Sequence, residues 1–194
     1  MKLITESELR SFSNTQNSVA LSAMVLESYR VESKANKTTI FLSHKHDESD
    51  ESKLNLSAAI SFLKKFGVEV YVDWLDKEMP KFTSGETAKK IKEKIRKNDK
   101  FILLATEEAI NSKWCNWELG LGDAAKYRNN IALLAVQKDN SDYTGSEYLN
   151  IYPYITYENG TNTYTDGKYI TEGYYVRYSD TNTILPLKIW LQKS

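Results

Sequence analysis

The stretch Phe101-Ile-Leu-Leu-Ala105 decides the fold, because it is an unbroken run of apolar residues. A short continuous apolar run is typical of a strand that is buried on both faces of a sheet. Three further runs have a similar apolar and β-branched character: Thr38-Thr-Ile-Phe-Leu-Ser43, Val68-Glu-Val-Tyr-Val-Asp73 and Ile131-Ala-Leu-Leu-Ala-Val136. Together the four runs predict the strands of one central sheet.

Helical segments separate these strands. Apolar residues recur with helical spacing over 54–66, where Gly67 follows in the C-cap position, and similar signals predict helices over 86–97 and from Ser112 to about Tyr127. Alternating strands and helices predict a parallel sheet with helices on both faces, which is an α/β fold of three layers. The loops after the strands then share one rim, where α/β proteins bind ligands.

An N-terminal segment precedes this core. Leu9, Phe12 and later apolar residues recur at nearly helical spacing and predict an amphipathic helix over 5–30. Polar residues 32–37 follow and are typical of a linker. We therefore separate residues 1–37, an N-terminal helix and linker, from one main domain over 38–194.

The last third of the chain has a different pattern. Segments 152–157 and 168–178 alternate polar and apolar residues, with the turn pairs Asn159-Gly160 and Asp166-Gly167 between them, so a β-hairpin is expected. A short closing helix is predicted over 185–191, with Pro186 in its first turn. The main domain thus has a core over 38–136 and a C-terminal extension over 140–194.

Composition excludes several classes of function. The 194 residues carry a formal net charge of zero, so nucleic acid and acidic membranes are not expected partners. The single cysteine, Cys115, cannot form an internal disulfide, which favours a reducing, cytoplasmic location, and no apolar run approaches the roughly 20 residues of a membrane span. Neither Gly-x-Gly-x-x-Gly nor Gly-x-x-x-x-Gly-Lys-Ser/Thr occurs, which disfavours dinucleotide redox chemistry and ATP hydrolysis.

The densest chemical signal is Asn111-Ser-Lys-Trp-Cys-Asn-Trp-Glu-Leu119. Trp114 and Glu118 are four residues apart and share one helix face. A carboxylate buried without a partner costs several kcal/mol or takes up a proton, so Glu118 is expected to face a cleft on the rim. The alternative is that Glu118 reaches a lysine such as Lys113 or Lys126 while the tryptophans belong to the core. Cys115 is expected to be structural, because no histidine is near it in the sequence.

The loop after the first strand is a second candidate. Ser43, His44 and Lys45 follow the apolar run directly, and the charged and imidazole groups could face phosphates. The alternative is a solvated loop that caps the next helix. A metal site on His44 and His46 is not expected, because no third ligand stands at a recognisable spacing.

The end of the second strand is a third candidate. Tyr71 and Asp73 could line the same pocket, and strand alternation puts them on one face. The alternative for Asp73 is a polar strand terminus bonded to its loop. For Trp74, Met79 and Phe82 we weigh local loop packing against docking on a neighbouring subunit.

In order and type, these segments resemble Toll/interleukin-1 receptor (TIR) domains over residues 38–136. Thr39-Ile-Phe-Leu-Ser43 resembles their first strand and loop, and Gly67-Val-Glu-Val-Tyr-Val-Asp73 their second strand entering the BB loop. The run from Phe101 and the helix start at Ser112 resemble the third strand and the Ser-x-Trp-Cys…Glu-Leu segment. The resemblance implies a three-layer, flavodoxin-like fold with a mostly parallel five-stranded sheet.

The stand-alone form, the N-terminal helix and Asp73-Trp-Leu-Asp76 resemble most the bacterial TIR sensor proteins of Thoeris anti-phage defence. In enzymatic TIR domains the glutamate of this helix is catalytic, which implies that Glu118 cleaves the nicotinamide–ribose bond of NAD⁺. Trp114 would then stack on the nicotinamide end, and the 43–45 loop would contribute to the nucleotide site. The implied product is ADP-ribose or a cyclic isomer, and the Thoeris likeness implies the cyclic signal.

The resemblance implies NAD⁺ as substrate, with no separate cofactor. It also implies self-association through TIR–TIR contacts and a downstream effector that senses a diffusible nucleotide. Two alternatives remain open at this point. One is a non-enzymatic TIR adaptor, in which Glu118 is dispensable or occluded, and the other is an enzyme like the nucleoside deoxyribosyltransferases.

Overall fold

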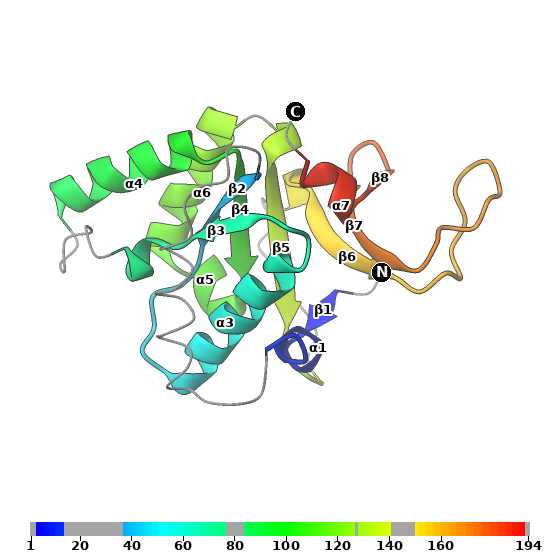
Figure 1. The fold of residues 1–194 in the computed structure, drawn as a ribbon, viewed down its shortest axis with the longest axis horizontal. Coiled ribbons are helices and arrows are strands. Elements are labelled where there is room, and N and C mark those ends of the chain that lie inside the picture. Colours follow the sequence, from blue (N-terminus) through cyan, green and yellow to red (C-terminus); the bar gives the residue numbers. More distant parts are fainter. Residues whose placement is uncertain (1–2, 14–36, 77–83, 127, 141–149, 193–194) are drawn as a thin grey trace.

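The chain folds around one twisted sheet that is flanked by helices (Figure 1). The structure is a computed structural model that describes residues 3–13, 37–76, 84–126, 128–140 and 150–192. Within these ranges the sheet has eight strands, seven of them in the order β3-β2-β4-β5-β6-β7-β8, with β1 paired to β5 off this path. No helix in these ranges has both the length and the apolar character that crossing a bilayer requires.

The centre of the sheet is parallel, as the sequence predicts. Five neighbouring strands of this order pair in parallel: β3 (Glu69–Tyr71), β2 (Thr39–Ser43), β4 (Lys100–Ala105), β5 (Ile131–Gln137) and β6 (Tyr154–Glu158). The four predicted core strands therefore confirm the expected α/β fold with a mostly parallel sheet, although the whole sheet has eight strands where five were expected.

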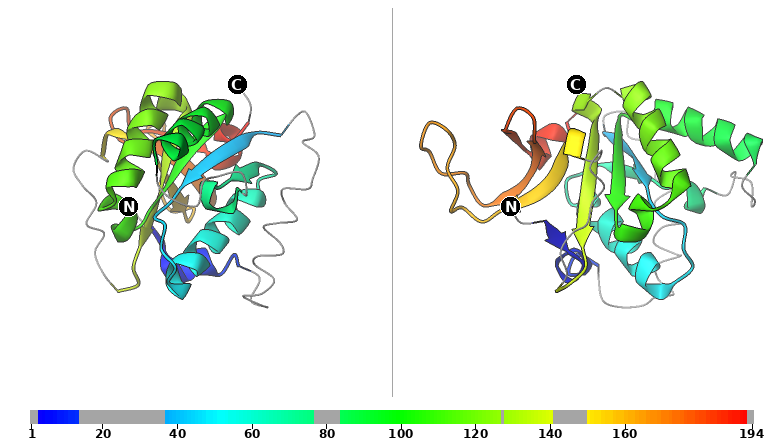
Figure 2. Two further views of the ribbon diagram at one scale, coloured as in Figure 1. Left: turned by 90° about the vertical axis from the view of Figure 1, so that its left-hand side faces the viewer. Right: turned by 180° about the vertical axis from the view of Figure 1, so that it is seen from behind.

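Helices cover both faces of the sheet, which gives three layers (Figure 2). One face packs against α3 (Asp50–Lys64), which contributes Phe62 and Leu63 to the core. The other face packs against α4 (Gly85–Lys97) and α6 (Lys113–Lys126). Strand alternation divides β2 between the two layers, because Ile40 and Leu42 lie in one buried cluster and Phe41 in the other.

The N-terminal prediction is wrong in part. Instead of one helix from residue 5, the chain forms β1 (Ile4–Thr5) and α1 (Glu6–Arg10), which then ends in a turn over 11–13. Thr5 caps α1, and the hydroxyls of Ser11 and Ser13 donate to the backbone carbonyls of Glu8 and Arg10, which competes with further helix. The remainder of the predicted helix, residues 14–30, lies outside the described residues.

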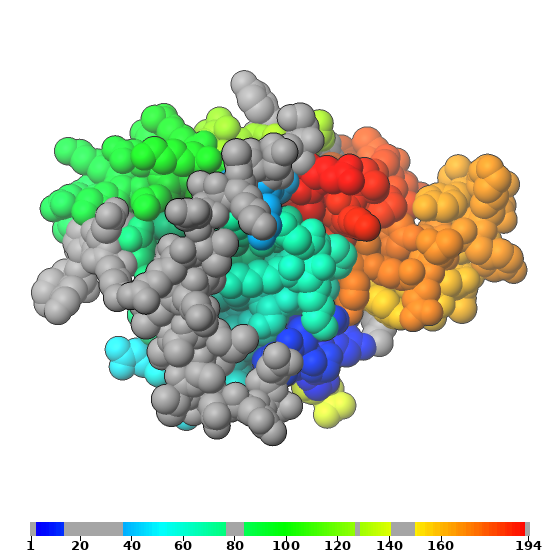
Figure 3. Space-filling view, viewed as in Figure 1, coloured from blue at the N-terminus to red at the C-terminus, as the bar shows by residue number. Residues whose placement is uncertain are grey.

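The C-terminal extension forms the predicted hairpin and adds to it. β7 (Gly173–Tyr178) pairs antiparallel with β6, and β8 (Thr183–Pro186), which the sequence did not indicate, pairs with β7. The expected second strand of the hairpin, 168–178, begins only at Gly173, and residues 159–172 form an arm that projects from the body (Figure 3). Its turns use Gly160 and Gly167, each with φ of +83°. The closing helix is α7 (Leu187–Trp190), and Pro186 precedes it as the N-cap instead of lying in its first turn.

Candidate active site

The carboxyl ends of the parallel strands bring the candidate residues to one rim. Ser43 ends β2, and Asp73 opens a 3₁₀ turn, η1 (Asp73–Leu75), just after β3. β4 leads into a short helix, α5 (Glu107–Ile110), which precedes α6. Because β2 pairs with both β3 and β4, these three chain ends lie next to one another.

A close approach between α6 and the sheet positions Glu118. Gly122 lies so near the Phe101 ring that an added Cβ would stand 2.8 Å from its Cγ. Phe101 is itself fixed, because its ring stacks on Phe41 with centroids 5.7 Å apart. Glu118 is one helical turn before Gly122 and points from the same face, so it reaches the sheet beside this contact.

The central interaction of the rim joins Glu118 to the first strand. The hydroxyl of Ser43 donates to Oε2 of Glu118 at 2.5 Å. Both side chains are buried, and Glu118 is only 2% exposed. The pair connects two of the three segments that the sequence identified as candidates, although 75 residues separate them along the chain.

The surroundings of Glu118 favour its protonated form. Burial, and next the negative charge of Asp73, raise its pKa to about 8, while hydrogen bonds from Ser43 and Trp114 lower it. Lys126 does not pair with it, because its ammonium group donates to the backbone carbonyls of Arg96 and Asn98. Within the described ranges no lysine or arginine forms an ion pair with Glu118.

Trp114 lies beside the carboxyl group with a second indole. It is half-buried against the core of this face, and its ring lies 4.9 Å from that of Trp117. Trp117 is 37% exposed, so the pair extends from the core to the surface. The structure thus brings together an acid and an aromatic surface, as the spacing of Trp114 and Glu118 predicts.

His44 is buried, and neither of its ring nitrogens has a hydrogen-bond partner among the residues that the structure describes. Its Nδ1 lies 3.9 Å from Oδ1 of Asp73, a separation at which an ion pair would form if the ring were charged. Burial, however, outweighs the attraction of Asp73 and lowers the pKa of His44 to about 4. At neutral pH the imidazole that faces Asp73 is therefore uncharged.

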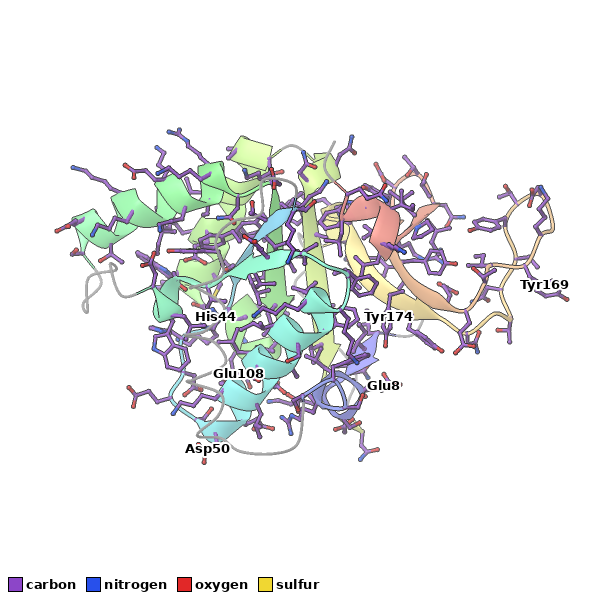
Figure 4. The ribbon with its side chains drawn as sticks, viewed as in Figure 1. Glu8, His44, Asp50, Glu108, Tyr169 and Tyr174 are labelled. Carbon is purple, nitrogen blue, oxygen red and sulfur yellow. The ribbon has the colours of Figure 1, made fainter. Side chains whose placement is uncertain are left out.

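A polar cavity of about 70 Å³ opens on the α3 side of the rim. His44 and Lys45 line it together with Glu108, and Figure 4 shows His44 and Glu108 on this side of the molecule. The other lining residues come from α1, the loop before α3, the first turns of α3, the end of β4 and the N-cap of α5: Glu6, Asp47, Ser49, Glu51, Ser52, Asn55, Leu104 and Thr106. Glu118 does not line this cavity, so the cavity and the buried acid are separate features that meet at residues 43 and 44.

Tyr71 has a different environment from the other candidates. Its hydroxyl donates to Oδ2 of Asp76 at 2.7 Å, and the Lys94 ammonium lies 4.8 Å from the centre of its ring. Lys94 also forms an ion pair with Asp76 at 2.7 Å. Tyr71 and Asp73 do not continue one alternating strand, because β3 ends at Tyr71 and Asp73 begins the η1 turn. These contacts tie Tyr71 to α4.

Two further sequence interpretations concern Cys115 and metals. Cys115 is fully buried, and burial raises the pKa of its thiol to about 11, which makes it a poor nucleophile. Among the residues that the structure describes, no three His, Cys, Asp or Glu side chains gather closely enough to hold a metal ion.

The sequence analysis missed the acidic and amide groups of the cavity. Thr106 caps α5 and Glu108 lies in its first turn, but this helix has only four residues and is too short for apolar periodicity to reveal it. The usable signal was Thr106 followed by Glu107 and Glu108, since threonine is a preferred N-cap and acids are favoured in a first turn. Glu6 and Asn55 gave no comparable signal, because the bond between them joins α1 to α3 across the fold.

Comparisons with known proteins agree with this architecture. Residues 40–168 match the TIR domain family. The chain is also 30% identical over 167 residues to a Bacillus cereus (strain MSX-D12) protein described as "Probable 3' cyclic ADP-D-ribose synthase ThsB'", an alignment that covers 80% of this chain and 83% of that protein. With the parallel sheet, the helix layers and the matched span in agreement, the chain belongs to the TIR domain family.

Proposed function

We propose that this TIR domain cleaves the nicotinamide–ribose bond of NAD⁺, with Glu118 as the catalytic carboxylate. The observation that carries the proposal is a buried acid on the rim, held by Ser43 and Trp114 and paired with no cation of the described residues. A buried acid with a strongly perturbed pKa, next to an aromatic surface, is typical of a reactive site.

The chemistry of NAD⁺ suits a single carboxylate. The pyridinium nitrogen leaves with the electron pair of the C1′–N bond, so no general acid is needed. The ribose then develops positive charge as in glycoside hydrolysis, and a carboxylate beside it stabilises that charge. Water adding to C1′ gives ADP-ribose after losing a proton, while a nucleophile within the nucleotide gives a cyclic isomer.

The raised pKa of Glu118 is compatible with this role. A cation next to a carboxyl group favours the ionised form, so the bound pyridinium would promote loss of the proton from Glu118. Trp114 would stabilise the same positively charged ring by stacking and cation–π attraction, an effect of roughly 0.5–2 kcal/mol. Because Glu118 is 2% exposed, substrate entry requires the side chains around it to move.

The remaining assignments follow from position. Ser43 orients the acid, Lys45 and His44 would meet the phosphates, and Asp73 would contact the nicotinamide ribose. Tyr71 remains a weaker candidate for substrate contact, because Asp76 already accepts its hydroxyl.

We further propose that the product is a cyclic ADP-ribose isomer that acts as a signal. The relative described as a probable 3′ cyclic ADP-ribose synthase supports this choice. The signal would diffuse to a nucleotide-sensing effector in the cytoplasm as part of anti-phage defence. Self-association through TIR–TIR contacts would regulate the activity.

The decisive experiment is mass spectrometry of nucleotides after concentrated protein is incubated with NAD⁺. The wild type should release nicotinamide, Glu118→Gln should not, and Glu93→Gln, the same change at an exposed position of α4, should match the wild type. Equal release by wild type and Glu118→Gln would exclude the proposed role.

The burial of Glu118 also favours a second candidate, a TIR adaptor that acts through protein contacts alone. On that view the acid is occluded and dispensable. No nicotinamide would be released at any protein concentration, and Glu118→Gln would preserve self-association and signalling. The third candidate, a deoxyribosyltransferase-like enzyme, gains no support from the family match.

A further inference from the structure

The rim carries an exposed tryptophan that the proposed reaction does not use. Trp74 lies in η1, directly after Asp73, and is 41% exposed. In contrast, Trp190 of α7 is 3% exposed and belongs to the core. A large exposed aromatic side chain beside a candidate active site is often part of a binding surface.

Trp74 forms a corner with an exposed histidine. The rings of Trp74 and His46 lie 5.4 Å apart at 83°, so one plane stands perpendicular to the other. The buried ring of His44 is next to both, 6.4 Å from Trp74 and 5.8 Å from His46. In this corner the flat face of the Trp74 indole can stack on a planar ligand. The His46 ring, perpendicular to it, can contact the edge of the same ligand through its own edge or a ring nitrogen.

The corner is connected to Glu118 by short contacts. Asp73 precedes Trp74 and lies 3.9 Å from His44, and Ser43, which bonds to Glu118, precedes His44. The two segments follow β2 and β3, which are adjacent strands of the sheet. A ligand that reaches from the acid along this edge therefore meets the corner next.

From these positions we infer that Trp74 and His46 form the subsite that stacks the adenine ring of NAD⁺, an inference that rests on the proposed function. NAD⁺ has a flat ring at each end, and this rim holds two separate indoles, Trp114 beside Glu118 and Trp74 beside the two histidines. Trp114 contacts Glu118 and so lies at the nicotinamide end, which leaves Trp74 for the other base. Lys45, between the two histidines in the sequence, supplies a positive charge for the linking pyrophosphate.

Binding of substrate fragments tests the assignment without turnover. In the Glu118→Gln background, titration calorimetry with AMP, nicotinamide mononucleotide and NAD⁺ separates the two ends of the dinucleotide. Trp74→Ala should weaken AMP and NAD⁺ roughly tenfold, within the range of base–aromatic stacking, and leave nicotinamide mononucleotide within about twofold. Trp74→Phe should retain most of the affinity, and His46→Ala should lose roughly two- to fivefold.

Tyr169→Ala is the matched control. Tyr169 is 71% exposed on the projecting arm, well away from His44 (Figure 4). This variant should bind all three nucleotides as its parent does. In active protein, Trp74→Ala should raise KM for NAD⁺ roughly tenfold and leave kcat nearly unchanged, because stacking far from the reacting bond is the same in the ground and transition states.

The outcomes separate the subsite from the proposed function. Unchanged AMP affinity in Trp74→Ala would overturn the subsite, and so would an equal loss for nicotinamide mononucleotide. A change only in self-association, measured by sedimentation, would instead assign Trp74 to a subunit contact and overturn it as well. If the wild type cleaves no NAD⁺ but its AMP binding depends on Trp74, the subsite stands and the proposed function fails.

Discussion

Two buried glutamates show how differently the rim and the C-terminal extension accommodate a carboxyl group. Glu158, in β6, is 5% exposed and meets the guanidinium of Arg177 at 3.0 Å and the amide of Asn162 at 2.7 Å. Glu118, in α6, is 2% exposed and accepts the hydroxyl of Ser43, with no cation of the described residues paired to it. One acid has its countercharge inside the fold, and the other does not.

The difference suggests different purposes for the two acids. A buried carboxylate with a built-in cation and hydrogen bonds is satisfied and fixes local structure, here the base of the projecting arm. A buried carboxyl group without one is costly when ionised, and its charge can be matched by a positively charged ligand. The comparison therefore assigns structure to Glu158 and chemistry to Glu118.

The strongest test of this comparison is the same substitution at both sites. Glu118→Gln should lower kcat for NAD⁺ cleavage at least roughly hundredfold, because the developing positive charge loses its stabilising carboxylate. Glu158→Gln should stay within about threefold of the wild type once the rate is corrected for folded protein. Nicotinamide release, followed by chromatography, measures both, and similar losses in the two variants would contradict the division of roles.

The two substitutions should change the free energy of unfolding differently: Glu158→Gln should lower it, and Glu118→Gln should raise it relative to the wild type at alkaline pH. Glu158→Gln leaves Arg177 without its carboxylate and should lower the free energy of unfolding by about 1–3 kcal/mol. Glu118→Gln removes an acid whose pKa is raised to about 8 from its ordinary 4.5. The stabilisation from that raised pKa is fully present below about 4.5 and is lost as the pH rises through 8.

Urea unfolding at pH 6 and pH 9 measures this contrast. Relative to the wild type, Glu118→Gln should gain about 2 kcal/mol or more between the two pH values, because glutamine carries no charge to bury. The deficit of Glu158→Gln should change much less over the same interval. A Glu118→Gln variant that is equally destabilised at both pH values would show that the acid is a structural partner like Glu158.

Much of this architecture was predictable from the sequence, and the reason is local. The apolar runs at 38–43, 101–105 and 131–136 need burial on both faces, which a sheet covered by helices provides. The four-residue spacing of Trp114 and Glu118 likewise placed them on one helix face. The projecting arm escaped prediction because its residues alternate like a strand, yet only an isolated bridge between Thr163 and Tyr169 forms there.

The chemical environment of the site was less predictable. The partner of Glu118 could have been a lysine on the same helix, and spacing alone did not separate that from a cleft. The environment of Glu118 depends on tertiary contacts. Gly122 lets α6 approach Phe101. Lys126 donates to backbone carbonyls at the end of α4 and so does not pair with Glu118. The pairing of Ser43 with Glu118 across the sheet is likewise a long-range contact that no local pattern encodes.

The pH dependence of catalysis tests the role of Ser43. Activity of the wild type should rise as the pH passes through about 8, because the ionised form of Glu118 is the reactive one. The Ser43 hydrogen bond lowers the pKa of Glu118, so Ser43→Ala should move the profile to more alkaline pH and reduce the rate at pH 7 up to roughly tenfold. Recovery of the rate at high pH is the internal control, and a uniform loss at every pH would contradict this role.

The smallest expected effect concerns His44, which titrates in the direction opposite to Glu118. Its pKa is lowered to about 4 from 6.5 by burial, against the attraction of Asp73 and with the help of His46. The stability it contributes is present above pH 6.5 and is lost as the pH falls through 4. The wild type loses unfolding free energy as the pH falls from 6.5 to 4.5, and His44→Gln should reduce this loss by up to about 2 kcal/mol.

The double variant His44→Gln, Glu118→Gln sharpens the contrast with the extension. In the folded protein both rim groups stay uncharged between about pH 4 and pH 8, so the stability that depends on their neutral forms declines toward both ends of this interval. Removing both groups should give a stability profile that is flatter at the acid and the alkaline ends. If the double variant keeps the wild-type curvature, the pH dependence comes from elsewhere, and the rim no longer differs from the Glu158–Arg177 pair in this respect.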